Sequence, residues 1–269
     1  MLWTRGVSSF LACPLQDFIT ITGARASTSY GDHVARELAG SAAAEGRVVV
    51  TGGAYGIEGA VHQAALAAGG DTIAILAGGV DRPYPAGHRD LLDRVADVGT
   101  LVGEVLPGAV PTRHRFIARA RLLVALSFTM VVVEASARSG SLVVAQRALV
   151  LGRGVGAVPG PVTSATNVGP RRLLWDGTAS LVADTSDLAH LAERGTGHRV
   201  SISRAQIKAD RLRATTPALS HTSKDTISRI TDRVVEEMNS WVARSLEPIY
   251  AAIFIDAIVV KVRDEQVRN

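Results

Sequence analysis

The sequence predicts an α/β fold built on a mostly parallel β-sheet. Short β-branched runs, glycine-rich turns and helical stretches alternate from Phe18 to about Asp184, a pattern typical of βαβ units. Aromatic residues make up only 4% of the chain, which favours short aliphatic strands over an aromatic-rich β-sandwich. With 269 residues, 47% of them hydrophobic, the chain can bury a full core.

Seven segments are expected to form strands, because each is short and almost entirely apolar, as strands buried on both faces are. They are residues 18–22, 47–51, 72–76, 100–104, 130–135, 155–159 and 180–184. Two of the intervening helices are expected at residues 32–44 and 141–151, where apolar side chains recur on one face. Asp32 and Ser139 are the expected residues at their starts.

The composition changes after the last of these strands. Residues 195–224 are polar and basic, which indicates a linker. Beyond it, residues 226–242 have the spacing of an amphipathic helix, and residues 249–262 are expected to form a strand with no sheet to join. The expected division is a lead-in (1–17), a main domain (18–194), the linker (195–224) and a fragment (225–269) without its own core.

Charge and cysteine content narrow the class of protein. The formal net charge is +4 and the pI about 9.6, which is compatible with a polyanionic partner. Cys13 is the only cysteine, so one chain cannot build a disulfide or a cysteine-based metal site. The N-terminus lacks the pattern of a signal peptide, and the longest apolar run, residues 249–260, is too short to span a bilayer. We therefore expect a cytoplasmic protein without membrane contact.

Five glycine-rich segments follow predicted strands: residues 22–25, 51–57, 77–81, 136–140 and 159–161. Because open parallel sheets bind ligands beyond the carboxyl ends of their strands, these loops are expected to form a phosphate-binding rim. The alternative is that the glycines only permit tight turns. No GxGxxG with a following acidic residue and no GxxxxGK[ST] is present, so no nucleotide cofactor is expected.

Arginines gather around an aromatic residue in the segment 112–121. Arg113, Arg115, Arg119 and Arg121 flank Phe116, and Arg25 and Arg138 belong to the strand-end loops. Positive charge combined with a stacking surface is typical of single-stranded nucleic acid binding. The alternative is a solvated, arginine-rich helix face. Tyr30, Tyr55 and Tyr84 are further candidates for stacking, or for packing.

The sequence indicates no catalytic or metal site. Glu58, Asp81, Glu104 and Glu134 fall near strand ends, but no nucleophile motif such as GxSxG accompanies them. His62 lies one helical turn after Glu58, and a structural role is expected for it. We therefore expect a binding protein and not an enzyme.

Six motifs in this order closely resemble the DNA-processing protein A (DprA, or Smf) family: residues 21–31, 48–66, 69–88, 100–126, 131–153 and 155–174. The resemblance implies an extended Rossmann-like, doubly wound fold without a cofactor. It also implies single-stranded DNA binding, homodimers and loading of the RecA recombinase during natural transformation. By resemblance, the DNA-binding residues are Gly23, Arg25, Gly53, Gly56, Arg119, Arg121, Ser139, Gly140, Pro159 and Gly160.

Four positions depart from the family pattern. Glu58, Gly103, Ala120 and Val144 stand where Asp, Ser, Asn and Thr are usual. Each change alters a polar group whose buried hydrogen bond is worth about 1 kcal/mol. The fold is therefore expected to survive, with altered pocket geometry and DNA affinity.

The C-terminal segment, residues 225–269, resembles part of a mutator-type insertion-sequence transposase. Such enzymes use three carboxylates to hold two metal ions, and Asp256 resembles only the first of them. We therefore expect no metal site and no transposase activity. Two other readings stay open: a truncated fusion product without function, and a nucleotide-processing Rossmann enzyme. Enzymes of the latter kind carry a PGGxGTxxE loop, where this chain has Ser139-Gly140-Ser141.

Overall fold

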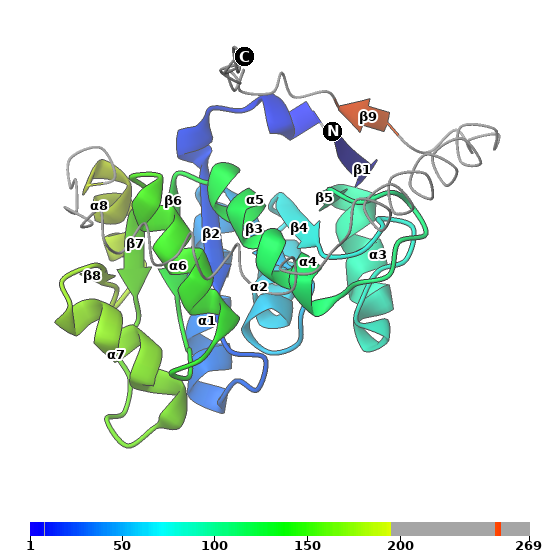
Figure 1. Ribbon diagram of the computed structural model, residues 1–269. Helices are drawn as coiled ribbons and strands as arrows, with labels where there is room; N and C mark the ends of the chain where they lie inside the picture. Colours follow the sequence, from blue (N-terminus) through cyan, green and yellow to red (C-terminus); the bar gives the residue numbers. More distant parts are fainter. Residues whose placement is uncertain (8, 195–250, 254–269) are drawn as a thin grey trace, which may run out of the picture.

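The computed structural model describes residues 1–7, 9–194 and 251–253, and Figure 1 shows their arrangement. The described strands form one sheet in the order β8-β7-β6-β2-β3-β4-β5-β1-β9. Their bounds are β1 Leu2–Gly6, β2 Phe18–Thr22, β3 Val48–Gly52, β4 Thr72–Leu76, β5 Thr100–Gly103, β6 Thr129–Val132, β7 Gly154–Ala157, β8 Ser180–Leu181 and β9 Ala251–Ile253. The helices are α1 Ser29–Ala44, α2 Ile57–Ala67, α3 Arg89–Val98, α4 Arg113–Ala118, α5 Ala120–Ala125, α6 Gly140–Val150, α7 Val168–Trp175 and α8 Ser186–Arg194. Short 3₁₀ turns join several of them.

The predicted α/β fold with a mostly parallel sheet is confirmed. All pairings among β2 to β8 are parallel. Each predicted strand is present and begins within one residue of its expected start. The strands predicted at 130–135, 155–159 and 180–184 end earlier, at Val132, Ala157 and Leu181. After β6 the chain leaves the ladder, because the Ala135 amide donates to the carbonyl of Thr166 at 2.6 Å.

The first strand was not predicted. β1 lies antiparallel beside β5, with Trp3 opposite Gly103. Trp3 is 4% exposed and packs with Leu76 and Leu92. Burial of this ring therefore draws the lead-in segment into the sheet.

The expectation that the C-terminal strand has no sheet to join is wrong for three of its residues. Ala251–Ile253 form β9, which pairs antiparallel with Leu2–Thr4 of β1. The linker (195–224), the predicted helix at 226–242 and the rest of the predicted strand at 249–262 lie outside the described residues.

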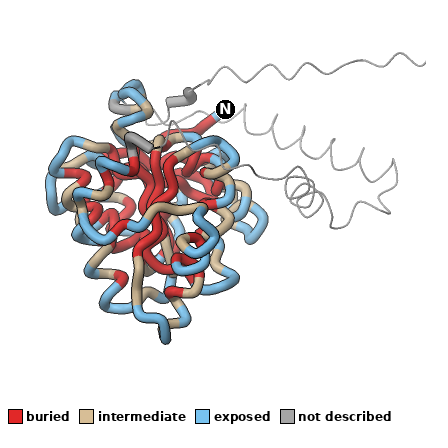
Figure 2. The backbone as a smooth tube through the Cα atoms, turned by 90° about the vertical axis from the view of Figure 1, so that its left-hand side faces the viewer, coloured by how far each residue is buried: buried red, intermediate tan, exposed pale blue. Residues whose placement is uncertain are grey.

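Helices cover both faces of the sheet, and strand side chains alternate between the two resulting cores. Phe18 and Val50 face α5, α6 and α7, whereas Ile19 and Ile21 face α1, α2 and α8. A smaller cluster joins α3 to β1, β4 and β5. Figure 2 shows the buried strands running through the middle of this layered arrangement. No helix in the described part of the chain is long and apolar enough to cross a membrane.

The two predicted helix starts have different outcomes. Ser139 precedes α6 and accepts a hydrogen bond from the Ser141 amide, as an N-cap residue does. Asp32 does not begin α1, which starts at Ser29. Thr28 caps this helix and accepts from the Gly31 amide at 3.1 Å. The extra turn brings the start of α1 closer to the end of β2.

Candidate nucleic-acid interface

The candidate site lies beyond the carboxyl ends of β2, β3 and β4. The order of strands reverses direction between β2 and β6, so a crevice is expected there. Glu134, just after β6, fills part of it. Its carboxylate accepts from the Thr28 amide at 2.9 Å, from Thr28 Oγ1 at 2.7 Å and from Thr166 Oγ1 at 2.9 Å. Glu134 thereby fixes the loop that carries Arg25.

Two arginines and two aromatic rings meet at this edge of the sheet. The guanidinium carbons of Arg25 and Arg119 lie 4.7 and 5.0 Å from the ring centroid of Phe116. Tyr84 meets the same ring edge-on, with 6.0 Å between centroids. We call Arg25, Tyr84, Phe116 and Arg119 the arginine–aromatic cluster. Arg25 is exposed and Tyr84 is 50% exposed, so the cluster offers charge and ring surface to solvent.

Arg119 is turned inward. Its Nη2 lies 3.1 Å from Glu58 Oε2, and its Nη1 donates to the carbonyl of Ile75 at 2.7 Å. Both side chains of the ion pair are under 10% exposed. Gly52 leaves room for them, since a Cβ at this residue would overlap both charged groups. These contacts make Arg119 a support for Phe116, whereas its guanidinium has little surface left for a phosphate.

Glu58 is ionised in this arrangement. Burial by itself would raise the pKa of the Glu58 carboxyl, but the charge of Arg119 and hydrogen bonds from the Ala54 amide and Thr22 Oγ1 outweigh it and hold the pKa below its usual value. These two donors lie 2.9 and 3.1 Å from the carboxylate. The pair is therefore a satisfied, buried ion pair.

The other candidate carboxylates also have structural partners. Glu104 forms an ion pair with Arg121 at the surface. Asp81 accepts from the Gly108 amide at 2.7 Å. In the described residues, no group of three or more His, Cys, Asp or Glu side chains could hold a metal ion. Arg121, expected in the DNA-binding pocket, is half-exposed but shares its charge with Glu104.

Glycines bring the loop of Arg25 against the start of α2. Gly56 has φ +73°, and a Cβ there would overlap the carbonyl oxygens of Ala24 and Arg25. The Ile57 amide donates to the carbonyl of Ala24 at 3.1 Å. Gly23 packs on the same residue, since its Cβ would lie 2.7 Å from Ile57 Cγ1. Gly23 and Gly56 thus join two of the predicted loops directly.

The remaining predicted residues lie at varying distances from this junction. The carbonyl oxygen of Gly53 lies 3.1 Å from Nδ1 of the His88 ring, within hydrogen-bond distance. The carbonyl of Pro159 accepts from the Tyr30 hydroxyl at 2.6 Å, and Gly160 packs tightly on Asn167. Ser139 and Gly140 form the start of α6. Within the described residues, no hydrogen bond or ring contact joins these last two to the arginine–aromatic cluster.

The four departures from the family pattern are accommodated in the fold. Ala120 and Val144 are both buried in the apolar cluster between the sheet and α5 and α6. Gly103 packs against the carbonyl of Gly78, 3.1 Å from where its Cβ would lie. Glu58 makes the ion pair described above. Apolar packing at the first two positions explains how the core closes without the usual polar groups.

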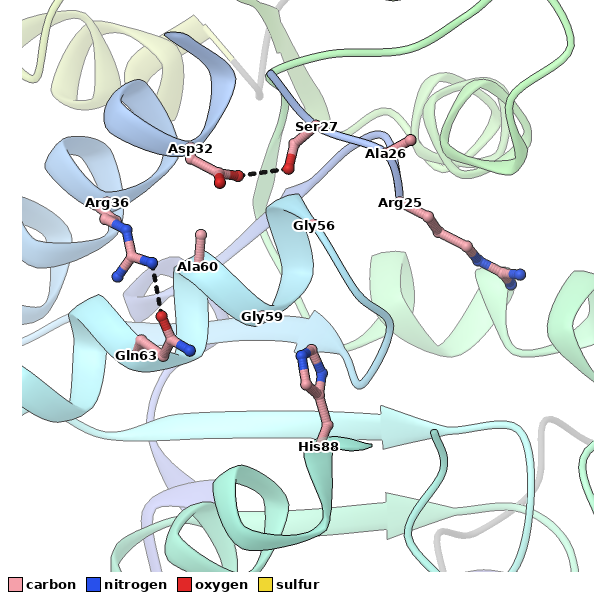
Figure 3. Close-up of a pocket in the computed structure, with 10 residues that line it drawn as sticks. All are labelled: Arg25, Ala26, Ser27, Asp32, Arg36, Gly56, Gly59, Ala60, Gln63 and His88. Carbon is pink, nitrogen blue, oxygen red and sulfur yellow. Dashed lines mark hydrogen bonds between the residues drawn. The ribbon is translucent and has the colours of Figure 1, made fainter. Parts of the chain in front are cut away.

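An open cavity of about 280 Å³ adjoins Arg25 on the side of α1 and α2. Figure 3 shows its lining, which comprises Arg25, Ala26, Ser27, Asp32, Arg36, Gly56, Gly59, Ala60, Gln63 and His88. Of these, only Arg25 and Gly56 were predicted as site residues. Arg36 lies outside the family motifs, and Gln63 and His88 lie inside two of them without having been singled out. The packing of α1, α2 and the turn before α3 brings the three side chains to one cavity.

His62 has the structural role expected of it. Its Nδ1 lies 2.8 Å from Thr72 Oγ1 and its Nε2 lies 3.1 Å from the carbonyl of Gly52. Burial is the main cause that lowers the pKa of His62, from 6.5 to about 4. The imidazole is therefore neutral at pH 7 and ties α2 to β3 and β4.

This burial predicts an acid-sensitive fold. The unfolded chain takes up a proton on His62 below its ordinary pKa of 6.5, whereas the folded chain does so only near pH 4. The free energy of unfolding should thus fall by about 3 kcal/mol as the pH drops from 7 to 4. Urea unfolding at several pH values measures this loss, and it should be smaller in His62→Gln. An identical pH profile in this variant would contradict the assignment.

Comparisons with known proteins agree with this arrangement. The family model described as DNA recombination-mediator protein A matches residues 1–193. A DprA-type protein of Mycobacterium tuberculosis is 52% identical over 168 residues, which are 62% of this chain and 43% of that protein. DNA processing protein DprA of Bacillus subtilis is 36% identical over 65% of this chain and 59% of its own length. The chain thus spans less than two thirds of these relatives.

Two solved structures have the same fold. The X-ray structure of DNA processing protein A from Streptococcus pneumoniae matches with a TM-score of 0.66 and 33% identity, over 70% of this chain and 65% of that one. A structure of DNA processing protein A from Helicobacter pylori, whose description names its single-stranded DNA binding mode, matches with a TM-score of 0.65 and 27% identity. The match covers 71% of this chain and 86% of that one.

The C-terminal segment has separate relatives. The Mutator-family transposase model matches residues 207–269. A probable insertion-sequence transposase of Corynebacterium diphtheriae is 55% identical over 42 residues, which are 16% of this chain and 12% of that protein. The predicted transposase-like fragment is thereby confirmed as a resemblance. Because the other family model matches residues 1–193, well over half of the sequence, the chain belongs to the DNA recombination-mediator protein A family.

Proposed function

We propose that this chain binds single-stranded DNA at the arginine–aromatic cluster without catalysing a reaction on it. The observation that carries the proposal is the exposed Arg25 guanidinium, 4.7 Å from the ring centroid of Phe116. Planar guanidinium and aromatic groups accept unpaired bases by stacking, and the charge attracts the phosphate backbone. A duplex keeps its bases stacked on one another and gains only the charge interaction.

The chemistry of the site supports binding over catalysis. Glu58, Glu104 and Glu134 are each engaged by arginine or by hydrogen-bond donors of the fold. General acid or base catalysis requires a carboxyl group within reach of a substrate proton. The single-stranded DNA binding stated for the Helicobacter pylori relative supports the same function here.

The family relationship extends the proposal to a pathway. We infer a cytoplasmic homodimer that hands its bound strand to the RecA recombinase during uptake and recombination of DNA. The support is the family's description as a recombination mediator and the match to DprA proteins. Arg119 is proposed as an inward-facing support. The surrounding DNA-binding residues are proposed to be Gly23, Gly53, Gly56, Arg121, Ser139, Gly140, Pro159 and Gly160.

Fluorescence anisotropy with labelled oligo-dT tests the core of this proposal. Titrations of the purified chain at two salt concentrations should show salt-sensitive binding to the single strand and weaker binding to the same strand in a duplex. A well-folded sample that binds neither would instead identify a fusion product that keeps the fold without the function.

A further inference from the structure

We propose that the open cavity between α1 and α2 is a second subsite for the same DNA strand, in which Arg36 binds a backbone phosphate. The inference rests on the proposed function, because Arg25 borders both this cavity and the arginine–aromatic cluster. It gives the bound strand a path over the surface, from Phe116 across Arg25 and over the start of α2 to Arg36.

The shape of the cavity suits a chain that lies along α2. Gly56, Gly59 and Ala60, at the start of α2, line it, and none has a side chain larger than a methyl group. The His88 ring packs closely over Gly59. Asp32 and Arg36 of α1 line one side, with Gln63 of α2 beside Arg36. In Figure 3 the Arg25 side chain points away from Arg36, and the start of α2 at Gly56 lies between them. A strand that contacts both arginines would therefore have to cross the start of α2 at Gly56.

The charge of Arg36 is available to a ligand. Its side chain is exposed, and its Nη2 donates to the neutral amide oxygen of Gln63 at 2.6 Å. Asp32 stands four residues earlier in α1, a spacing that often yields an ion pair. Here, however, the Asp32 carboxylate accepts from Ser27 Oγ. By contrast, Arg119 and Arg121 are each neutralised by a glutamate.

A phosphodiester group fits this lining better than a small apolar ligand. The volume of about 280 Å³ lies just below the usual range for small-molecule pockets, and the lining is mainly polar.

Two variants of α1 should change the affinity in opposite directions. Arg36→Gln removes a phosphate contact and should weaken oligo-dT binding several-fold at low salt, with a salt slope reduced by about 0.7. Asp32→Asn removes a negative charge from the cavity but keeps an acceptor for Ser27. It should tighten binding. Both are measured by fluorescence anisotropy of labelled oligo-dT with the full chain.

Matched controls separate a local contact from the effect of overall charge. Arg94→Gln on α3 and Glu37→Gln on α1 make the same charge changes at exposed residues that do not line the cavity. If Arg36→Gln and Arg94→Gln weaken binding equally, or Asp32→Asn and Glu37→Gln tighten it equally, the subsite is overturned. If the subsite is overturned in this way but Arg25→Ala still loses binding, the proposed function at the arginine–aromatic cluster remains supported. If the unchanged chain does not bind oligo-dT, both proposals fail together.

Discussion

Replacing Glu58 with glutamine should lower the free energy of unfolding by about 3 kcal/mol. The variant leaves the buried Arg119 guanidinium without a carboxylate partner, and breaking a buried ion pair on one side typically costs 3–5 kcal/mol. Glutamine keeps one acceptor oxygen, which can still accept from the Ala54 amide. Its NH2 group then takes the place of the oxygen that accepts from Thr22, and the Thr22 hydroxyl can turn to accept from it. Urea unfolding followed by circular dichroism at pH 7 measures the change.

Glu104→Gln is the matched control, because Glu104 pairs with Arg121 at the surface. Exposed pairs contribute up to about 1 kcal/mol, so this variant should unfold close to the unchanged chain. Glu58→Asp should fall between the two, as a shorter carboxylate retains the charge. Equal stability of Glu58→Gln and Glu104→Gln would mean that burial of the Glu58–Arg119 pair contributes nothing to the fold.

Arg25→Ala should weaken oligo-dT binding at least tenfold and leave the melting temperature unchanged. The side chain is exposed, and its described interaction is the one with the Phe116 ring. Because the lost contact is to phosphate and to base faces in general, oligonucleotides of different sequence should lose affinity alike, and the salt slope should fall by about 0.7. Anisotropy titrations over a salt series measure both quantities.

Phe116→Ala separates stacking from charge in this cluster. It should weaken binding by about 1–3 kcal/mol per stacked base with little change in salt slope. Arg172→Ala on α7 serves as a charge control, since the exposed Arg172 side chain pairs with Asp176 just after the end of this helix. A loss of affinity restricted to particular sequences would argue against phosphate and stacking contacts, and equal losses in Arg25→Ala and Arg172→Ala would argue against a defined site.

Local patterns in the sequence were enough to locate the parallel strands. β2 and β4 have the predicted ends because glycine follows each apolar run within two residues, Gly23 after β2 and Gly78 after β4. The ends of β6 and β7 were placed too late, since apolar residues continue past the ladder into the packed loops. β1 escaped prediction because its five residues are held by β5, almost a hundred residues away.

In the candidate site, too, contacts between residues distant in the sequence could not be predicted. The sequence identified Arg25, Phe116 and Arg119 as a group, because charge and aromatic residues are visible in the sequence itself. It gave no means of telling that Arg25 faces solvent and Arg119 faces inward. That difference depends on Glu58, 61 residues before Arg119, and on the space left by Gly52.

The sequence by itself therefore determined the fold class, most of the strand positions and the residue types of the proposed DNA site. These follow from local periodicity and from motifs read along the chain. Tertiary structure alone decided where α1 begins, which arginine is neutralised and that α1 and α2 enclose a cavity beside Arg25. The physical reason is that a side chain's direction and charge state depend on partners brought together by folding from distant parts of the sequence.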